Sequence, residues 1–300
     1  MWLIVYSYTG QQTQTTNDKL KTINRTMQQV ETFFQNIGPI WSAIVGGIFT
    51  WMCTLLGASF VFFFKEMKRS VLDTMLGLSG GIMLAASIFS LLVPSIEMSE
   101  KSFPSTPWLP AMVGFALGAL FVYALDKVLP HVHINFKQSE AEGVKSSWHR
   151  TTLLIMAITL HNIPEGLAVG VVFGAALNGV GDASVAGAIA LAIGIGIQDI
   201  PEGFAVSMPL RRQGLSRWKS FYYGQLSAIV EPIAAIIGAV LVIFMESFLP
   251  FALAFAAGAM IFVVVEEVIP ETQRDKYTDV AALGFIAGFL IMMFLDVSLG

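Results

Sequence analysis

The 300-residue chain has one cysteine and few charged residues. Cys53 alone excludes both an intrachain disulfide and a zinc cluster built from several thiolates of this chain. Only 13% of the residues are charged, whereas 55% are hydrophobic, and the mean hydropathy is +0.70. A soluble domain of this length needs far less apolar surface. The composition therefore predicts an all-α integral membrane protein whose partner is the lipid bilayer and not a nucleic acid.

Windows of about 20 apolar residues, the length that spans a bilayer, recur along the chain between charged or proline-rich connectors. They predict a domain of eight transmembrane helices at 39–300, preceded by a polar segment at 1–38 that we expect to be disordered. The connector 131–150 is expected to be a short cytosolic loop. The predicted spans are 39–64, 71–93, 108–130, 151–175, 185–208, 220–245, 250–268 and 279–298.

Basic residues are unevenly distributed over the connectors. Thirteen of the 17 Lys and Arg residues follow odd-numbered spans, and four lie on the opposite side. The positive-inside rule then places both termini outside, in the extracellular space or an organelle lumen. Nothing in the sequence chooses between the plasma membrane and an intracellular membrane such as that of the Golgi. Asn24 begins a glycosylation sequon on the outer side, and whether it is used stays open.

Two near-identical hexapeptides lie within predicted spans, HNIPEG at 161–166 and QDIPEG at 198–203. One connector separates them, so the two spans are antiparallel, and a rise of about 1.5 Å per residue from the flanking arginines places both motifs near mid-bilayer. Polar side chains at this depth need a partner that offsets their desolvation. Because imidazole, amide and carboxylate groups ligate metals, the predicted partner is a divalent cation.

Positions four residues apart share one face of a helix, so each motif offers a pair of ligands to one ion. The residue after the first ligand of each motif lies about 100° further round the helix. Together with the same two glutamates, these residues could hold a second ion. The shared face carries His161, Glu165, Gln198 and Glu202, and the adjacent positions are Asn162 and Asp199.

A further carboxylate, Glu231, precedes Pro232 in the sixth span and also falls at mid-depth. Taken alone, it could equally be a polar side chain that a neighbouring helix satisfies. Each hexapeptide also contains a proline, which frees the carbonyl one turn earlier. Paired proline-interrupted spans are typical of the binding site of a transporter built from repeats.

The two hexapeptides and the Glu231-Pro232 pair resemble the ZIP (Zrt/Irt-like) family of divalent metal transporters, and most closely its GufA-type branch. The resemblance covers roughly residues 40–300, including 83–87 and 254–259. It implies a bundle of eight transmembrane helices, a binuclear midplane site between the fourth and fifth helices, and movement of zinc or a similar ion toward the cytosol.

The resemblance also implies roles for residues outside the hexapeptides. Ser90 would lie near the first ion site, and Glu231 would contribute to the second. Glu97 would be an acidic entrance residue, and Glu267 would lie toward the cytosolic exit. Beside Glu267 the family often has a histidine, where this chain has Glu266.

The ligand set has one imidazole but no thiolate, which favours borderline to hard divalent ions over copper(I). Zinc is the first choice, with iron(II), manganese and cadmium as alternatives. The ion is expected to be cargo, without a prosthetic group, and a carrier and a channel-like path both stay open. Small residues are dense in the later spans, which suits either close helix packing or a homodimer face.

Two other classes of function use the same residues. In a proton-coupled carrier of an organic solute, the intramembrane carboxylates would form a proton relay. In an intramembrane metalloenzyme, two bridged ions would activate water. The enzyme is disfavoured because the chain has no His-Glu-x-x-His motif and three of its four histidines lie in or beside one connector. We therefore predict a transporter and not an enzyme.

Overall fold

In the computed structural model of the chain, all regular structure in the described residues is helical, which confirms the predicted fold class. The sequon at Asn24 and the connector 131–149 lie outside these residues. The described residues are 25–64, 68–130, 150–179, 183–212, 214–244, 248–273 and 276–299.

The chain divides into two units, Met1–Gly38 and Pro39–Gly300. In the first unit, residues 25–37 are helical, although the polar composition led us to expect disorder there. Six of these 13 residues have high helix propensity, namely Arg25, Met27, Gln28, Gln29, Glu31 and Gln35. The hydroxyl of Thr32 also donates to the carbonyl of Gln28 one turn earlier.

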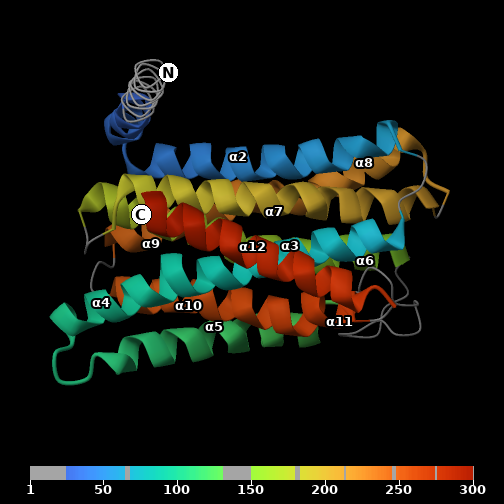
Figure 1. The fold of residues 1–300 in the computed structure, drawn as a ribbon. Helices are drawn as coiled ribbons and strands as arrows, with labels where there is room; N and C mark the ends of the chain where they lie inside the picture. The colour runs from blue at the N-terminus through green and yellow to red at the C-terminus, as the bar shows by residue number, and fades with distance from the viewer. Residues whose placement is uncertain are drawn as a thin grey trace, which may run out of the picture. The chain divides into compact units, whose positions relative to one another are not determined.

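The second unit contains the helices that matter for function (Figure 1). Three membrane spans each consist of two consecutive helices joined by a short non-α segment. These segments are Ser87–Leu92 and Val264–Val268, which are π-helical, and the 3₁₀ turn Ser227–Ile229. The helices are α2 (Pro39–Ser59), α3 (Arg69–Ala86), α4 (Val93–Ser102), α5 (Trp108–Val128), α6 (Arg150–Asn178), α7 (Val185–Arg212), α8 (Arg217–Leu226), α9 (Val230–Phe244), α10 (Leu249–Val263), α11 (Ile269–Thr272) and α12 (Thr278–Leu299).

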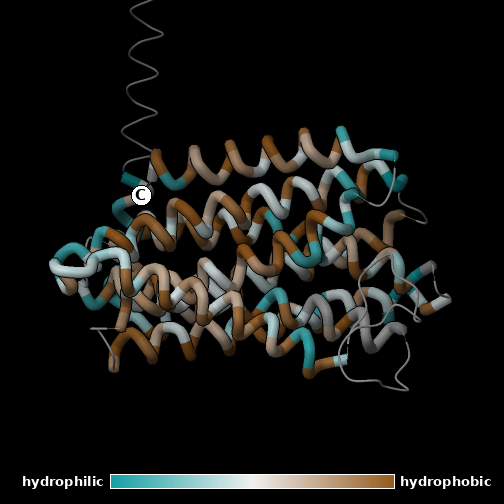
Figure 2. Tube along the Cα trace, turned by 90° about the horizontal axis from the view of Figure 1, so that it is seen from below, coloured by the Kyte–Doolittle hydropathy of each residue, from teal (hydrophilic) through white to brown (hydrophobic). Residues whose placement is uncertain are grey.

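Among the described residues, eight helical segments are long and apolar enough to cross a membrane, so the predicted number of spans is confirmed. Hydrophobic residues run along the helices, and hydrophilic residues gather toward the two ends of the unit (Figure 2). We call these ends the α4 end, where the C-terminus also lies, and the α11 end, which α8 shares (Figure 1).

The helices that carry the hexapeptides are central in the unit. The most apolar window is 78% buried in both α6 and α7, but only 22% buried in α12. The closest partner of α6 is α9 and that of α7 is α2, while α3 packs along α12 and α5 along α10. Large apolar side chains are exposed on α5 and α12, as expected for helices that face lipid.

The last glycine of each hexapeptide lies at one of these close helix contacts. A β-carbon on Gly166 would lie 2.5 Å from the carbonyl oxygen of Glu231 on α9, and one on Gly203 would collide with the carbonyl of Thr54 on α2. In the last span, Gly288 approaches the carbonyl of Leu78 on α3. These small residues therefore serve packing between helices of one chain, and the Gly166 contact brings α9 against the first hexapeptide.

Candidate metal centre

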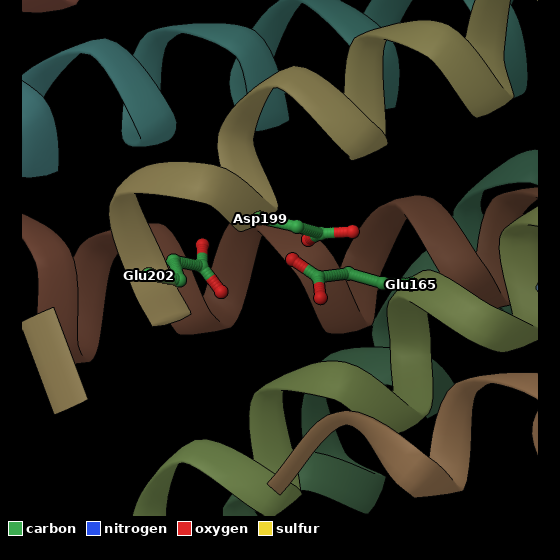
Figure 3. A group of neighbouring side chains, drawn as sticks. All are labelled: Glu165, Asp199 and Glu202. Carbon is green, nitrogen blue, oxygen red and sulfur yellow. The ribbon is translucent and has the colours of Figure 1, made fainter. Parts of the chain in front are cut away.

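Three carboxylates from α6 and α7 converge in the middle of the bundle (Figure 3). Glu165, Asp199 and Glu202 each offer an oxygen, and these atoms all lie within 4.8 Å of one another. Glu165 and Asp199 are fully buried, and Glu202 is slightly accessible. Such a cluster of oxygen donors has the spacing that a divalent cation requires.

The two amides of the hexapeptides each donate to a carboxylate on a neighbouring helix. The side-chain nitrogen of Gln198 donates to Oε1 of Glu165, which links α7 to α6. Nδ2 of Asn162 donates to Oε1 of Glu231 at 3.0 Å, which links α6 to α9. Because each amide nitrogen donates to a carboxylate, the oxygen of the same amide points away from that carboxylate.

The oxygen atoms that remain are buried and accept no hydrogen bond from the described part of the chain. Leaving a buried polar atom unpaired is costly, and native proteins seldom do so without a ligand or water. A divalent cation would satisfy these atoms, so the residues present fit a metal ion. The unpaired atoms are Oε2 of Glu165, Glu202 and Glu231, both Oδ atoms of Asp199, Oδ1 of Asn162 and Oε1 of Gln198.

His161 lies one turn before Glu165 on α6, at 9% exposure, and is not one of the three residues whose oxygens lie within 4.8 Å of one another. Its Nε2 lies 2.5 Å from Oε1 of Glu267. Glu267 belongs to the π-helical segment Val264–Val268 that continues α10 toward α11. The structure therefore places Glu267 against the predicted ligand His161, at the α11 side of the cluster.

A cavity of about 210 Å³ lies at the α4 end of the bundle. Ser90, Glu97 and Asp296 line it, and Oγ of Ser90 donates to Oδ1 of Asp296 at 2.5 Å. Val172 also lines the cavity, and it lies seven residues beyond Glu165 on α6, a rise of about 10 Å. Ser90, which the resemblance placed near the first ion site, thus shares this separate cavity with Glu97.

Sequence reasoning missed Ser79, whose hydroxyl on α3 donates to Oε1 of Glu202 at 2.6 Å. No sequence signal identifies it, because the two residues are 123 positions apart and meet only through packing. The sequence likewise does not indicate Asp296, which accepts the hydrogen bond from Ser90.

Sequence reasoning also missed a part-buried charge network at the α11 end. Arg69 lies 2.8 Å from Asp73 and 3.3 Å from Glu271, joining α3 to α11. The spacing of Arg69 and Asp73 by four residues was the available signal.

The fold and the site define a multi-pass membrane protein with a buried acidic cluster that could hold a metal ion. Residues 133–296 match the family described as ZIP Zinc transporter. The zinc transporter ZIP11 of Homo sapiens is 40% identical, over 89% of this chain and 99% of its own length. The zinc transporter GufA of Myxococcus xanthus is 35% identical over 86% of this chain and 99% of its own.

A third relative, the zinc transporter ZIPB of Bordetella bronchiseptica, is 38% identical over 86% of this chain and 81% of its own length. The chain belongs to the ZIP zinc transporter family. The family and the GufA-type branch inferred from the hexapeptides are therefore confirmed.

Proposed function

We propose that this protein carries divalent metal ions, zinc first, across a membrane through the acidic cluster of α6 and α7. The observation that carries the proposal is the set of buried, unpaired oxygen atoms on Glu165, Asp199, Glu202 and their amide neighbours. The names of the relatives support zinc as the cargo. They also support a role without catalysis, because a transporter releases its substrate unchanged.

The charge of the site supports two ions. Four carboxylates lie in it, on Glu165, Asp199, Glu231 and the slightly accessible Glu202. No Lys or Arg of the described residues forms an ion pair with any of them. When all four are ionised, two divalent cations balance their charge. In this proposal the first ion takes His161, Glu165, Gln198 and Glu202, and the second takes Asn162, Asp199 and Glu231 with the shared glutamates.

Transport toward the cytosol is the direction that the resemblance to the ZIP family implies, and the distribution of basic residues makes the α11 end cytosolic. The cavity at the α4 end, with Ser90, Glu97 and Asp296, is then the entrance, and Glu266 and Glu267 lie toward the exit. The least buried residues of the proposed site are His161 and Glu202, and His161 lies against Glu267 on the exit side. This arrangement supports a carrier in a state that is closed toward the entrance cavity.

Uptake of labelled zinc into proteoliposomes tests the proposal. We expect saturable uptake by the wild type, and its loss in His161→Ala and Glu202→Ala at matched protein abundance. Asp279→Ala is the control, because Asp279 is exposed at the start of α12, away from the cluster. Absence of metal uptake by folded, correctly oriented wild-type protein would overturn the proposal.

Equilibrium metal binding separates the proposed function from a proton-coupled carrier of an organic solute. The buried carboxylates of the site could in principle relay protons without binding metal. We expect about two zinc ions per chain, lost in the double variant Glu165→Ala with Glu202→Ala. No bound metal in the wild type would favour the organic solute carrier.

A further inference from the structure

Ser79 contacts the acidic cluster from a helix that carries none of the proposed metal ligands. It lies on α3, is 1% exposed, and its Oγ donates to Oε1 of Glu202 on α7 at 2.6 Å. A hydrogen bond from a hydroxyl to a carboxylate is among the stronger hydrogen bonds in proteins. The contact therefore fixes the orientation of the Glu202 carboxylate.

The two oxygens of Glu202 differ as a result. Oε1 is engaged by Ser79, whereas Oε2 is buried and accepts no hydrogen bond from the described residues. Glu202 thus presents one available oxygen to an ion in the cluster. Asp199 differs, since neither of its oxygens has a partner in the described chain.

We infer that Ser79 is a positioning residue that restricts Glu202 to one ligating oxygen, Oε2, and thereby favours zinc over manganese. The inference rests on the proposed function. Zinc in proteins is usually four-coordinate and tetrahedral, whereas manganese takes six ligands, mostly oxygens, in octahedral geometry. Without the hydroxyl, Oε1 of Glu202 is released and a small rotation of the carboxylate gives both oxygens to one ion. The added oxygen ligand favours binding of manganese, which has the higher coordination number.

The test is a competition between labelled manganese and labelled zinc for uptake into the same proteoliposomes. For Ser79→Ala we expect the manganese-to-zinc uptake ratio to rise by about threefold or more over that of the wild type. The ratio is informative because a variant that is merely less abundant or less stable loses uptake of both ions together. Ser87→Ala is the matched control, since Ser87 is buried on the same span but its hydroxyl donates to the carbonyl of Met83.

A second pair of variants separates the hydroxyl from the shape of the side chain. Threonine and valine have the same shape, but only threonine carries a hydroxyl donor. Ser79→Thr should keep the wild-type ratio, and Ser79→Val should show the raised one, whatever cost the extra methyl group has for total uptake. Equilibrium binding of each metal to the purified variants should show the same order.

An unchanged ratio in both Ser79→Ala and Ser79→Val would overturn the inference. A ratio that rises equally in Ser79→Thr and Ser79→Val would overturn it as well, because the hydroxyl would then not be responsible. Wild-type protein that transports neither metal would instead contradict the proposed function, so the two failures are distinguishable.

Discussion

Nε2 of His161 and Oε1 of Glu267 lie 2.5 Å apart, across the boundary between α6 and the π-helical segment after α10. A contact this close requires a proton on one of the two groups, either the imidazole nitrogen or the carboxyl oxygen. The same nitrogen must be deprotonated to bind a metal ion. An ion that uses Nε2 of His161 therefore has to displace both the proton and Glu267.

This contact predicts that zinc transport depends on pH. As the pH falls, protons compete with zinc for the imidazole of His161 and for the carboxylates of Glu165 and Glu202, so the apparent affinity for zinc decreases. We expect the apparent KM for zinc uptake to rise by up to about tenfold per pH unit for each displaced proton. The measurement is initial uptake against zinc concentration, from neutral to mildly acidic pH.

The control for this prediction is Asp279→Asn, which changes an exposed carboxylate outside the site and should keep the wild-type pH dependence. A KM that stays constant over the whole range would show that protons and zinc do not share ligands.

The eight spans and the pairing of ligands within each hexapeptide could be predicted from the sequence, because both depend on local periodicity. About 20 apolar residues define a span, and a spacing of four residues places His161 beside Glu165 on one helix face. For the fully buried Glu231, local periodicity gave only the right depth, and a role at the second ion came from the resemblance to the ZIP family. Its bond to Asn162 depends on the close approach of α6 and α9.

The parts of the site that the sequence did not reveal are contacts between helices far apart in the chain. The hydrogen bond between Ser79 and Glu202 and the network of Arg69 with Glu271 both require the packed bundle. The π-helical segment Val264–Val268 is a further case. One wider turn there changes which side chains face α6, so a strict count of 3.6 residues per turn does not predict the contact of Glu267 with His161.

Glu231→Gln should remove one of the two proposed ions. Asn162 donates to Oε1 of Glu231, so a glutamine at this position would accept that bond with its oxygen and place its NH₂ group where Oε2 now lies. An NH₂ group does not ligate a cation. We expect zinc bound at equilibrium to fall from about two ions per chain to about one, measured by titration of purified protein.

The matched control is Glu97→Gln, the same substitution in the separate cavity at the α4 end. It should leave the number of bound ions unchanged even if it slows uptake. Full retention of both ions in Glu231→Gln would show that Glu231 is not a ligand, and loss of both would show that the two ions do not bind separately.

Trp51→Phe should lower the free energy of unfolding, because Trp51 supports the 3₁₀ turn that interrupts the sixth span. The indole Nε1 of Trp51 on α2 lies 3.1 Å from the carbonyl oxygen of Gln225 and 3.0 Å from its Oε1, just before the 3₁₀ turn Ser227–Ile229. Phenylalanine lacks the donor and leaves these part-buried acceptors without it, at a cost of about 1–3 kcal/mol in the free energy of unfolding. Thermal or denaturant unfolding of purified protein measures the loss. Trp41→Phe, on the same helix but 64% exposed, should be close to neutral, and equal stability of both variants would show that the bond to Gln225 contributes nothing.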